Sequence, residues 1–324
     1  MTRFASWGII IDDIVFPDGR SVMGMPGGAG LYAAAGMRLW SPDVLLLAAV
    51  GDDFDAGTLV SYGLDPGGLR ASSLPTPRAW QLFEENGRRT QIFRVAKEVW
   101  YEQLVKGPLV GRIPESVEAA HYVLRGDTRE EEMVLTLVDK QIRLSAEPIV
   151  DEATTPEERR VILRCLAHFE LFSPDERSAA VLAGLRPAAD QLRMLAELGP
   201  RVVSLRQGAD GSLVYERERD CFWRVPAAPA RVVDVTGAGN AYCGGLLVGW
   251  HESGDVRRAA AYAAASAAIA IEQVGPPRLD EAASLTEAAS LTEAAPLTQA
   301  VMIDARRRAD RALEGIYAVN TAAL

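Results

Sequence analysis

The chain has 324 residues, a formal net charge of −10 and a hydrophobic fraction of 48%. This length exceeds that of one small hydrophobic core, so we expect a large domain with a small addition. The negative charge argues against nucleic acid or an anionic membrane as a partner. The start, MTRFASWGII, is not a signal peptide, and no apolar run reaches membrane-spanning length. The cysteines lack metal-binding spacing, so we expect a cytoplasmic protein with reduced thiols.

Apolar runs typical of buried strands alternate along the chain with helical patterns. The runs lie at 6–11, 44–50, 120–125, 147–150, 169–172 and 202–205, and helical patterns lie at 29–40, 130–142 and 156–169. This alternation predicts an α/β fold with a doubly wound, mostly parallel sheet covered by helices on both faces. We expect this main domain to span residues 1–280.

Two stretches, 12–25 and 78–95, break that alternation. Both are rich in β-forming residues and contain a turn signal, PDG in the first and ENG in the second. Two β-ribbons inserted into an α/β chain predict a small sheet beside the main domain, placed like a lid.

The C-terminal region contains a hexapeptide repeat, EAASLT, EAASLT and EAAPLT, over residues 281–298. A six-residue period turns a helix by about 600°, so the three leucines point in different directions and no apolar stripe forms. We therefore expect a surface insertion there, followed over 299–324 by an amphipathic helix packed on the main domain.

The stretch DVTGAGNAY, residues 234–242, carries the strongest chemical signal. Gly237, Ala238 and Gly239 precede an apolar run that is typical of a buried helix. A glycine-rich turn that opens a helix presents free N–H groups and a positive dipole end, which together favour an anion. Phosphoryl transfer there usually employs a carboxylate base, yet the chain has Asn240, an amide that accepts no proton near neutral pH.

Four features occur in a diagnostic order: Gly27–Gly28 before a helix, GDD at 51–53, QGADG at 207–211 and DVTGAGN. Together they resemble the ribokinase/pfkB family of small-molecule kinases over roughly residues 5–278. The resemblance implies a ribokinase-like fold with a β-sheet lid. It also implies transfer of the ATP γ-phosphate to a hydroxymethyl group of a sugar, nucleoside or related polyol, with ATP and Mg²⁺ as cofactors and K⁺ as a possible one.

The resemblance also implies roles for individual residues. It implies an anion hole at Gly237, Ala238 and Gly239, and it puts Asn240 at the position of the catalytic base. Substrate binding is implied for Asp13, which lies five residues after Gly8, and for Gly27, Gly28 and Tyr32. Nucleotide binding is implied for Asp175, Arg206, Gly208, Gly211 and Ala264, and a monovalent cation for Asp234.

Several positions depart from the family pattern. Tyr32 replaces an asparagine, Arg206 a threonine, and Asp175 with Ser178 stand in the N-x-x-E motif, so the glutamate linked to Mg²⁺ is missing. With GGAG-L-Y, TPRAWQ, AEPIV and TGAGNA, the chain resembles a divergent branch that includes the killer-virus maintenance proteins of fungi.

Two functions remain open from the sequence. The first is a kinase, slowed because Asn240 replaces the usual aspartate; then Asn240→Asp should restore a base and raise turnover by roughly tenfold or more. The alternative is an inactive kinase-fold protein that senses a nucleotide or nucleoside. A dinucleotide-binding oxidoreductase is disfavoured, because no glycine fingerprint follows the first strand. A homodimer through the lid is also expected, because open sheet edges are usually covered.

Overall fold

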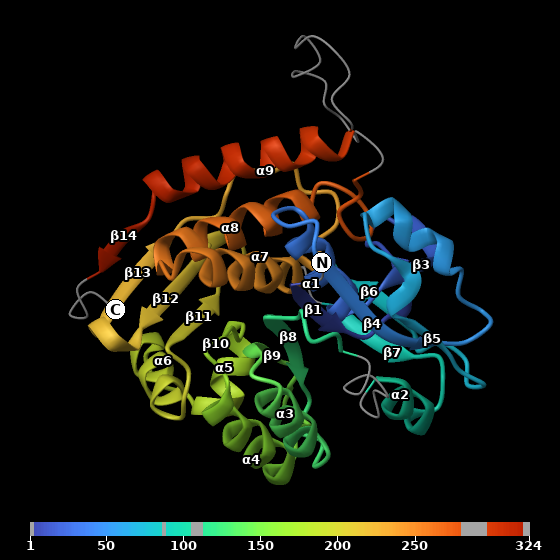
Figure 1. Cartoon of the computed structure of the whole chain (residues 1–324), viewed down its shortest axis with the longest axis horizontal. Helices are drawn as coiled ribbons and strands as arrows, with labels where there is room; N and C mark the ends of the chain where they lie inside the picture. The colour runs from blue at the N-terminus through green and yellow to red at the C-terminus, as the bar shows by residue number, and fades with distance from the viewer. Residues whose placement is uncertain (1–2, 86–88, 105–112, 280–296, 320–324) are drawn as a thin grey trace.

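The computed structural model describes residues 3–85, 89–104, 113–279 and 297–319. Its strands form one large sheet and one separate, smaller sheet (Figure 1). The large sheet has the order β14-β13-β12-β11-β10-β9-β8-β1-β4-β5. In chain order its strands are β1 (Phe4–Trp7), β4 (Val44–Val50), β5 (Leu69–Ala71), β8 (Ala119–Leu124), β9 (Arg143–Pro148), β10 (Leu171–Phe172), β11 (Val202–Arg206), β12 (Ser212–Glu216), β13 (Cys221–Val225) and β14 (Tyr317–Val319).

Pairing in the large sheet is parallel from β5 through β11 and antiparallel from β11 to β14. The parallel strands are buried on both sides, which is why their sequences are continuous apolar runs such as VLLLAAV in β4. The predicted doubly wound, mostly parallel sheet is therefore confirmed.

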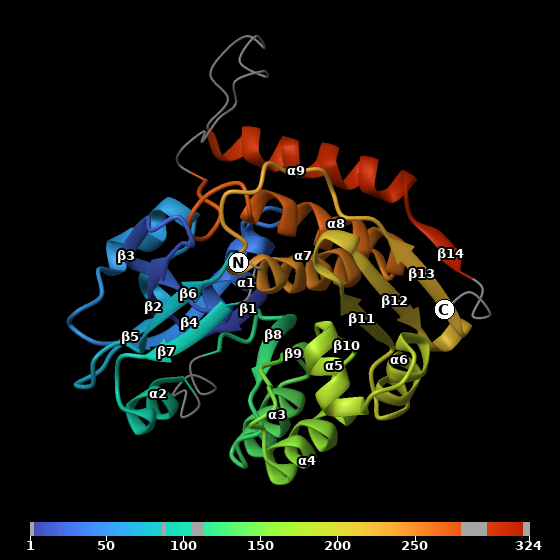
Figure 2. The same ribbon diagram turned by 180° about the vertical axis from the view of Figure 1, so that it is seen from behind.

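Helices cover both faces of this sheet (Figure 2). One face packs against α1 (Ala29–Arg38), α7 (Ala238–Ser253) and α8 (Val256–Ala270), with α9 (Leu297–Glu314) outside α8. The other packs against α3 (Glu130–Asp139), α4 (Pro156–Cys165), α5 (Glu176–Ala183) and α6 (Ala188–Glu197). Among the described residues, no helix combines the length and the hydropathy needed to cross a membrane.

The expected strand at 6–11 is two strands in different sheets. Strand β1 ends at Trp7, Gly8 has a positive φ of 98°, and β2 (Ile10–Val15) begins in the smaller sheet. A side chain at position 8 would be strained in this left-handed conformation, so glycine allows the chain to leave the large sheet here. The apolar run is continuous across this break because both strands are buried, and the sequence pattern therefore did not reveal it.

The smaller sheet, called the lid below, has the order β3-β2-β6-β7. It contains β2, β3 (Ser21–Gly27), β6 (Arg78–Phe83) and β7 (Arg89–Phe93). Strands β2 and β6 pair in parallel, so the two expected ribbons join into one sheet. Helix α2 (Lys97–Leu104) packs Trp100 and Leu104 against Ile10 and Ala79 of this sheet.

Most of the hexapeptide repeat lies outside the described residues, and its last two residues, 297–298, belong to α9. On the inner side of this helix, Ala305 and Ala309 are buried in the same hydrophobic core as residues of α8. The chain then forms β14, which pairs with β13 at the edge of the large sheet. The sequence analysis expected only a helix over 299–324, because pairing with a strand nearly one hundred residues earlier leaves no local signal.

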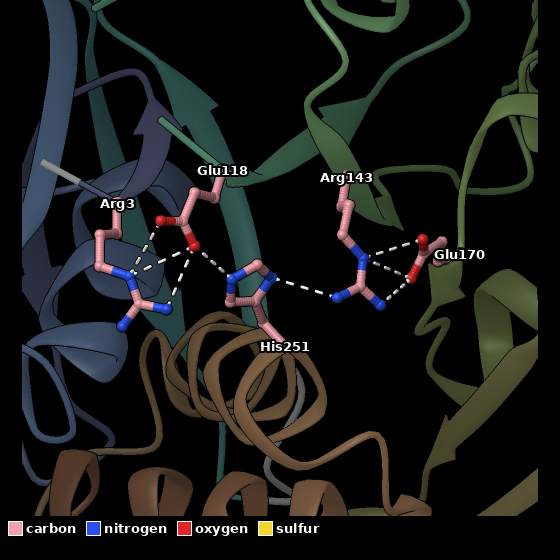
Figure 3. A network of polar contacts seen from close by, with 5 residues as sticks. All are labelled: Arg3, Glu118, Arg143, Glu170 and His251. Carbon is pink, nitrogen blue, oxygen red and sulfur yellow. Dashed lines mark hydrogen bonds and ion pairs between the residues drawn. The ribbon is translucent and has the colours of Figure 1, made fainter. Parts of the chain in front are cut away.

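A polar network fixes the far end of α7 at the amino edge of the sheet (Figure 3). His251, in the last turn of α7, bonds through Nε2 to Glu118 Oε2 at 2.7 Å and contacts Arg143 Nη1 through Nδ1 at 3.3 Å. Arg3 and Glu170 extend the network as ion-pair partners of Glu118 and Arg143. Since these four charged residues stand at or next to strand starts, the network ties α7 to four parallel strands and so helps to set the position of its other end.

Candidate active site

Helix α7 begins near the carboxyl ends of strands β9 and β11. Its N-cap is Gly237, in the left-handed conformation with φ 74°. The first N–H groups of a helix have no acceptor within it, so this start can bind an anion. Arg206, the last residue of β11, lies against it: a Cβ built on Gly239 would be only 2.2 Å from Arg206 Nη1. The Arg206 guanidinium therefore lies directly beside the N-terminus of α7.

Tyr32 packs beneath the anion-binding turn. Its side chain is 1% exposed, and a Cβ on Gly237 would lie 2.0 Å from its Cδ1 atom. Burial, with the nearby Asp12 and Asp234 carboxylates, raises the pKa of Tyr32 well above its ordinary value. The hydroxyl has no hydrogen-bond partner among the described residues. Tyr32 therefore supports the turn with its ring, and its expected contact with substrate stays a prediction.

Asn240 takes part in a buried polar cluster that the sequence analysis missed. Its Nδ2 donates to Glu147 Oε1 at 2.6 Å, and Arg206 Nη1 donates to Glu147 Oε2 at 2.8 Å. His121 contacts Glu147 Oε1 at 3.2 Å and Ser145 Oγ at 2.8 Å. The sequence did contain a signal for this cluster, because Glu147 stands in the buried strand LSAEP. An unpaired buried charge is costly, so a glutamate there indicates a partner elsewhere in the fold.

The charges in this cluster compensate each other. Burial by itself would raise the pKa of Glu147, but the Arg206 charge and hydrogen bonds from His121 and Asn240 outweigh it and lower that pKa to about 2. His121, Glu147 and Cys243 bring possible metal-ligand atoms within 4.8 Å of one another. Burial raises the pKa of the Cys243 thiol well above its usual range. Since Arg206 already occupies the carboxylate, the cluster is an ion pair and not a convincing metal centre.

On the lid side, Asp12 faces the glycine pair. A Cβ on Gly27 would lie 1.9 Å from Asp12 Oδ2, so no larger residue fits there. Gln81 Nε2 donates to Asp12 Oδ1 at 2.7 Å. Burial raises the pKa of Asp12 to about 6, although the Gln81 hydrogen bond acts in the opposite direction. Gly28, with φ 96°, is the N-cap of α1. Asp12 thus presents a desolvated carboxylate at the glycine pair.

Asp13 lies at a register shift in the pairing of β2 with β3, and its side chain has other partners than that of Asp12. Its carboxylate pairs with Arg78, at 2.7 Å, and with Arg94. Despite burial, these two arginines and the Gly24 N–H lower its pKa to about 2. Asp13, the aspartate expected to bind substrate, is therefore ion-paired with arginines of the lid. Its neighbour Asp12 is the aspartate that lies beside Gly27.

Asp234 stands just before the anion-binding turn and is 3% exposed. Its Oδ1 accepts hydrogen bonds from Thr236 N at 2.9 Å and Thr236 Oγ1 at 2.7 Å. Its Oδ2 is buried and has no partner among the described residues. A buried carboxylate oxygen without a donor is a plausible ligand for a cation, so this residue fits the expected monovalent-ion role.

A comparison with protein families decides the broad identity of this fold. A model described as pfkB family carbohydrate kinase matches residues 1–282. The chain belongs to the pfkB family. It is therefore a member of a family of phosphotransferases, as the TGAG turn and its context implied.

Individual pfkB relatives agree with this assignment. The chain is 30% identical over 250 residues to a cytidine kinase of Thermococcus kodakarensis, covering 75% of this chain and 86% of the relative. It is 25% identical over 315 residues to an uncharacterized protein of Schizosaccharomyces pombe, covering 85% and 86%. A putative ribokinase II of E. coli, solved with ATP and Mg²⁺, superposes with a TM-score of 0.72 at 18% identity, covering 96% and 100%. The likeness to the killer-virus branch stays a prediction.

The expected nucleotide-binding residues differ in how the pfkB fold presents them. Asp175 caps α5 by accepting from Ser178 N at 2.7 Å, and it forms an isolated parallel bridge with Arg206. A Cβ added at Gly208 would have no atom within 4 Å, so this glycine faces open space. A Cβ added at Gly211 would lie 2.0 Å from Val225 O, so this glycine is tightly packed. Ala264 is 6% exposed and packs in the core, so its side chain is not displayed to a ligand.

The residues near Asp175 do not form an obvious Mg²⁺ site. One oxygen of Asp175 already caps its own helix, and Ser178 offers a hydroxyl where the family has a glutamate. Mg²⁺ prefers an octahedral set of oxygens and usually binds through few carboxylates together with substrate phosphates. The protein's own oxygens therefore fit Mg²⁺ less well here than Asp234 fits a monovalent cation.

Proposed function

We propose that this chain transfers the γ-phosphate of ATP to a hydroxymethyl group of a nucleoside or a related sugar, without a side-chain base at position 240. The observation that carries the proposal is the start of α7, where the Gly237–Gly239 turn, the Arg206 guanidinium and the Asn240 amide meet. Phosphoryl transfer depends mainly on positioning and charge stabilisation, and these groups supply both.

Each residue has a part in this proposal. The N–H groups at Gly237, Ala238 and Gly239, with Arg206, stabilise charge on the transferred group. Asp12, in place of Asp13, accepts a hydrogen bond from a substrate hydroxyl above Gly27. The substrate oxygen forms a bond to the γ-phosphorus as the bond to the ADP oxygen breaks. The proton leaves late, to a phosphoryl oxygen or to water, because Asn240 orients the hydroxyl without accepting its proton.

Cofactors follow from the same groups. Asp234 would hold K⁺ through its free oxygen, and the ion would add positive charge near the anion-binding turn. Mg²⁺ would arrive with the ATP phosphates, which it neutralises when bound. Gly208 and Gly211 would bring backbone close to those phosphates, with Asp175 beside Arg206.

The test is ADP release measured with purified protein, ATP and a panel of nucleosides and sugars. Cytidine heads the panel because a cytidine kinase is the 30% identical relative. We expect acceptor-dependent ADP release, and a large loss of it in Arg206→Thr. ATP binding in calorimetry without ADP release for any acceptor would instead favour the nucleotide sensor.

A further inference from the structure

Asn240 is backed by a carboxylate from a distant strand. Glu147 on β9 is 2% exposed and lies 93 residues before Asn240, yet its Oε1 accepts the Asn240 amide hydrogen at 2.6 Å. An asparagine amide has a donor end and an acceptor end. Since Nδ2 is committed to Glu147, Oδ1 is the end that remains for a ligand.

Resting on the proposed function, we propose that Glu147 is a positioning residue that holds Asn240 with its acceptor oxygen toward the substrate hydroxyl and holds Arg206 at the anion-binding turn. Glu147 and Asn240 then form a matched pair. A carboxylate base at position 240 would carry a negative charge beside the reacting atoms. In this chain Glu147 on β9 carries that charge, one hydrogen bond further away.

The pairing explains why an aspartate does not suit position 240 in this chain. A carboxylate there would lie about as close to Glu147 as the amide does, and two carboxylates in contact, one buried and one half-buried, would not both ionise at neutral pH. One would retain a proton, or one side chain would move away. The expectation from sequence that Asn240→Asp restores a base is therefore reversed: the single change should be harmful unless Glu147 is neutralised as well.

The groups that face Glu147 come from three directions. His121 approaches from β8, Arg206 from β11, and Asn240 with Cys243 from α7. Asp175 forms a backbone bridge with Arg206, and its charge helps to raise the pKa of the guanidinium. Among the described residues, Arg206 is the one arginine or lysine that forms an ion pair with Glu147, at 2.8 Å, so a second carboxylate would compete for a single guanidinium.

The decisive experiment is a double-mutant cycle of Asn240→Asp and Glu147→Gln. Asn240→Asp alone should lower kcat by about tenfold or more and lower Tm. Its Tm should fall further between pH 6 and pH 8, because the raised pKa of a shared carboxyl pair makes the folded state lose stability as pH rises through it. Glu147 adds no such step in the wild type, because it stays ionised over this range. Asp12 and Glu130, whose pKa values burial raises to about 6 and about 7, give a fall in Tm that is common to all four proteins, so the readout is the fall in excess of the wild type.

Glu147→Gln alone should lower kcat by about tenfold while changing the acceptor KM less than threefold. Asn240 and Arg206 lose their orientation in this variant, but Asp12 and Gly27 on the lid side are unchanged. The double variant again carries one buried carboxylate, now at position 240 with Arg206 as its partner. Its kcat should exceed that of Asn240→Asp by roughly 100-fold or more, within the range of a general base, and its loss of Tm with pH in excess of the wild type should disappear.

Glu216→Gln is the matched control. Glu216 is another buried glutamate in an ion pair with an arginine, but it pairs with Val202 at the amino edge of the sheet, away from the start of α7. It should change Tm without changing kcat. Combined with Asn240→Asp, it should rescue nothing.

The cycle separates the two levels of the proposal. Additive Tm changes, or a double variant no better than Asn240→Asp, would overturn the Glu147–Asn240 pairing even if the wild type is a good kinase. Non-additive Tm changes with no ADP release from any of the four proteins would support the pairing and refute the proposed kinase function.

Discussion

Replacing Gly237 with alanine tests the support beneath the anion-binding turn. The new methyl group would meet the Tyr32 ring at 2.0–2.3 Å, and the residue would keep a φ of 74°. Left-handed backbone costs a non-glycine residue about 1–2 kcal/mol, and overpacking a buried site costs about 1–3 kcal/mol. Because Tyr32 is fully buried and cannot swing away, the two costs add to about 2–5 kcal/mol.

Thermal melting with and without nucleotide measures this effect. At roughly 2–4 °C per kcal/mol, Gly237→Ala should lower Tm by about 4–20 °C and weaken ATP binding. Gly254→Ala is the matched control: this C-cap of the same helix also has a positive φ, of 62°, but no atom lies within 4 Å of a built Cβ. It should show only the backbone cost. Equal Tm losses for the two alanines, with ATP affinity intact in both, would refute the packing argument.

Four further outcomes are expected. Asp12→Asn should raise the acceptor KM at least tenfold, whereas Asp13→Asn should mainly lower Tm; equal KM changes would contradict the assignment. Since the Asp12 pKa is raised to about 6, the wild-type KM should rise as pH falls below 6, and Asp12→Asn should remove that dependence. His251→Ala should lower Tm by roughly 2–8 °C, because it breaks hydrogen bonds to charged groups worth about 1–2 kcal/mol after screening, and a changed kcat would show a wider role. Lid pairing through the open edge predicts a dimer in light scattering, and Ile92→Glu, at a 45% exposed residue of the edge strand β7, should make it monomeric.

The sequence by itself determined the fold class and the position of the glycine-rich turn that opens α7. Strands buried on both faces produce continuous apolar runs, and a turn of small residues before an apolar helix is a local feature, so 44–50 and 237–239 could be assigned without coordinates. The absence of a carboxylate at Asn240 was equally plain. Each of these properties depends on residues close together in the chain.

Only the tertiary structure decided which side chains meet at the site. The chain leaves the large sheet at Gly8, and the smaller sheet places Asp12 beside Gly27 and Asp13 beside two lid arginines, which the spacing from Gly8 did not predict. Glu147 reaches Asn240 because β9 ends where α7 begins, a meeting fixed by sheet order and not by local pattern. That meeting reverses the expected effect of Asn240→Asp, since the ionisation of a buried carboxylate depends on the charges that the fold places around it.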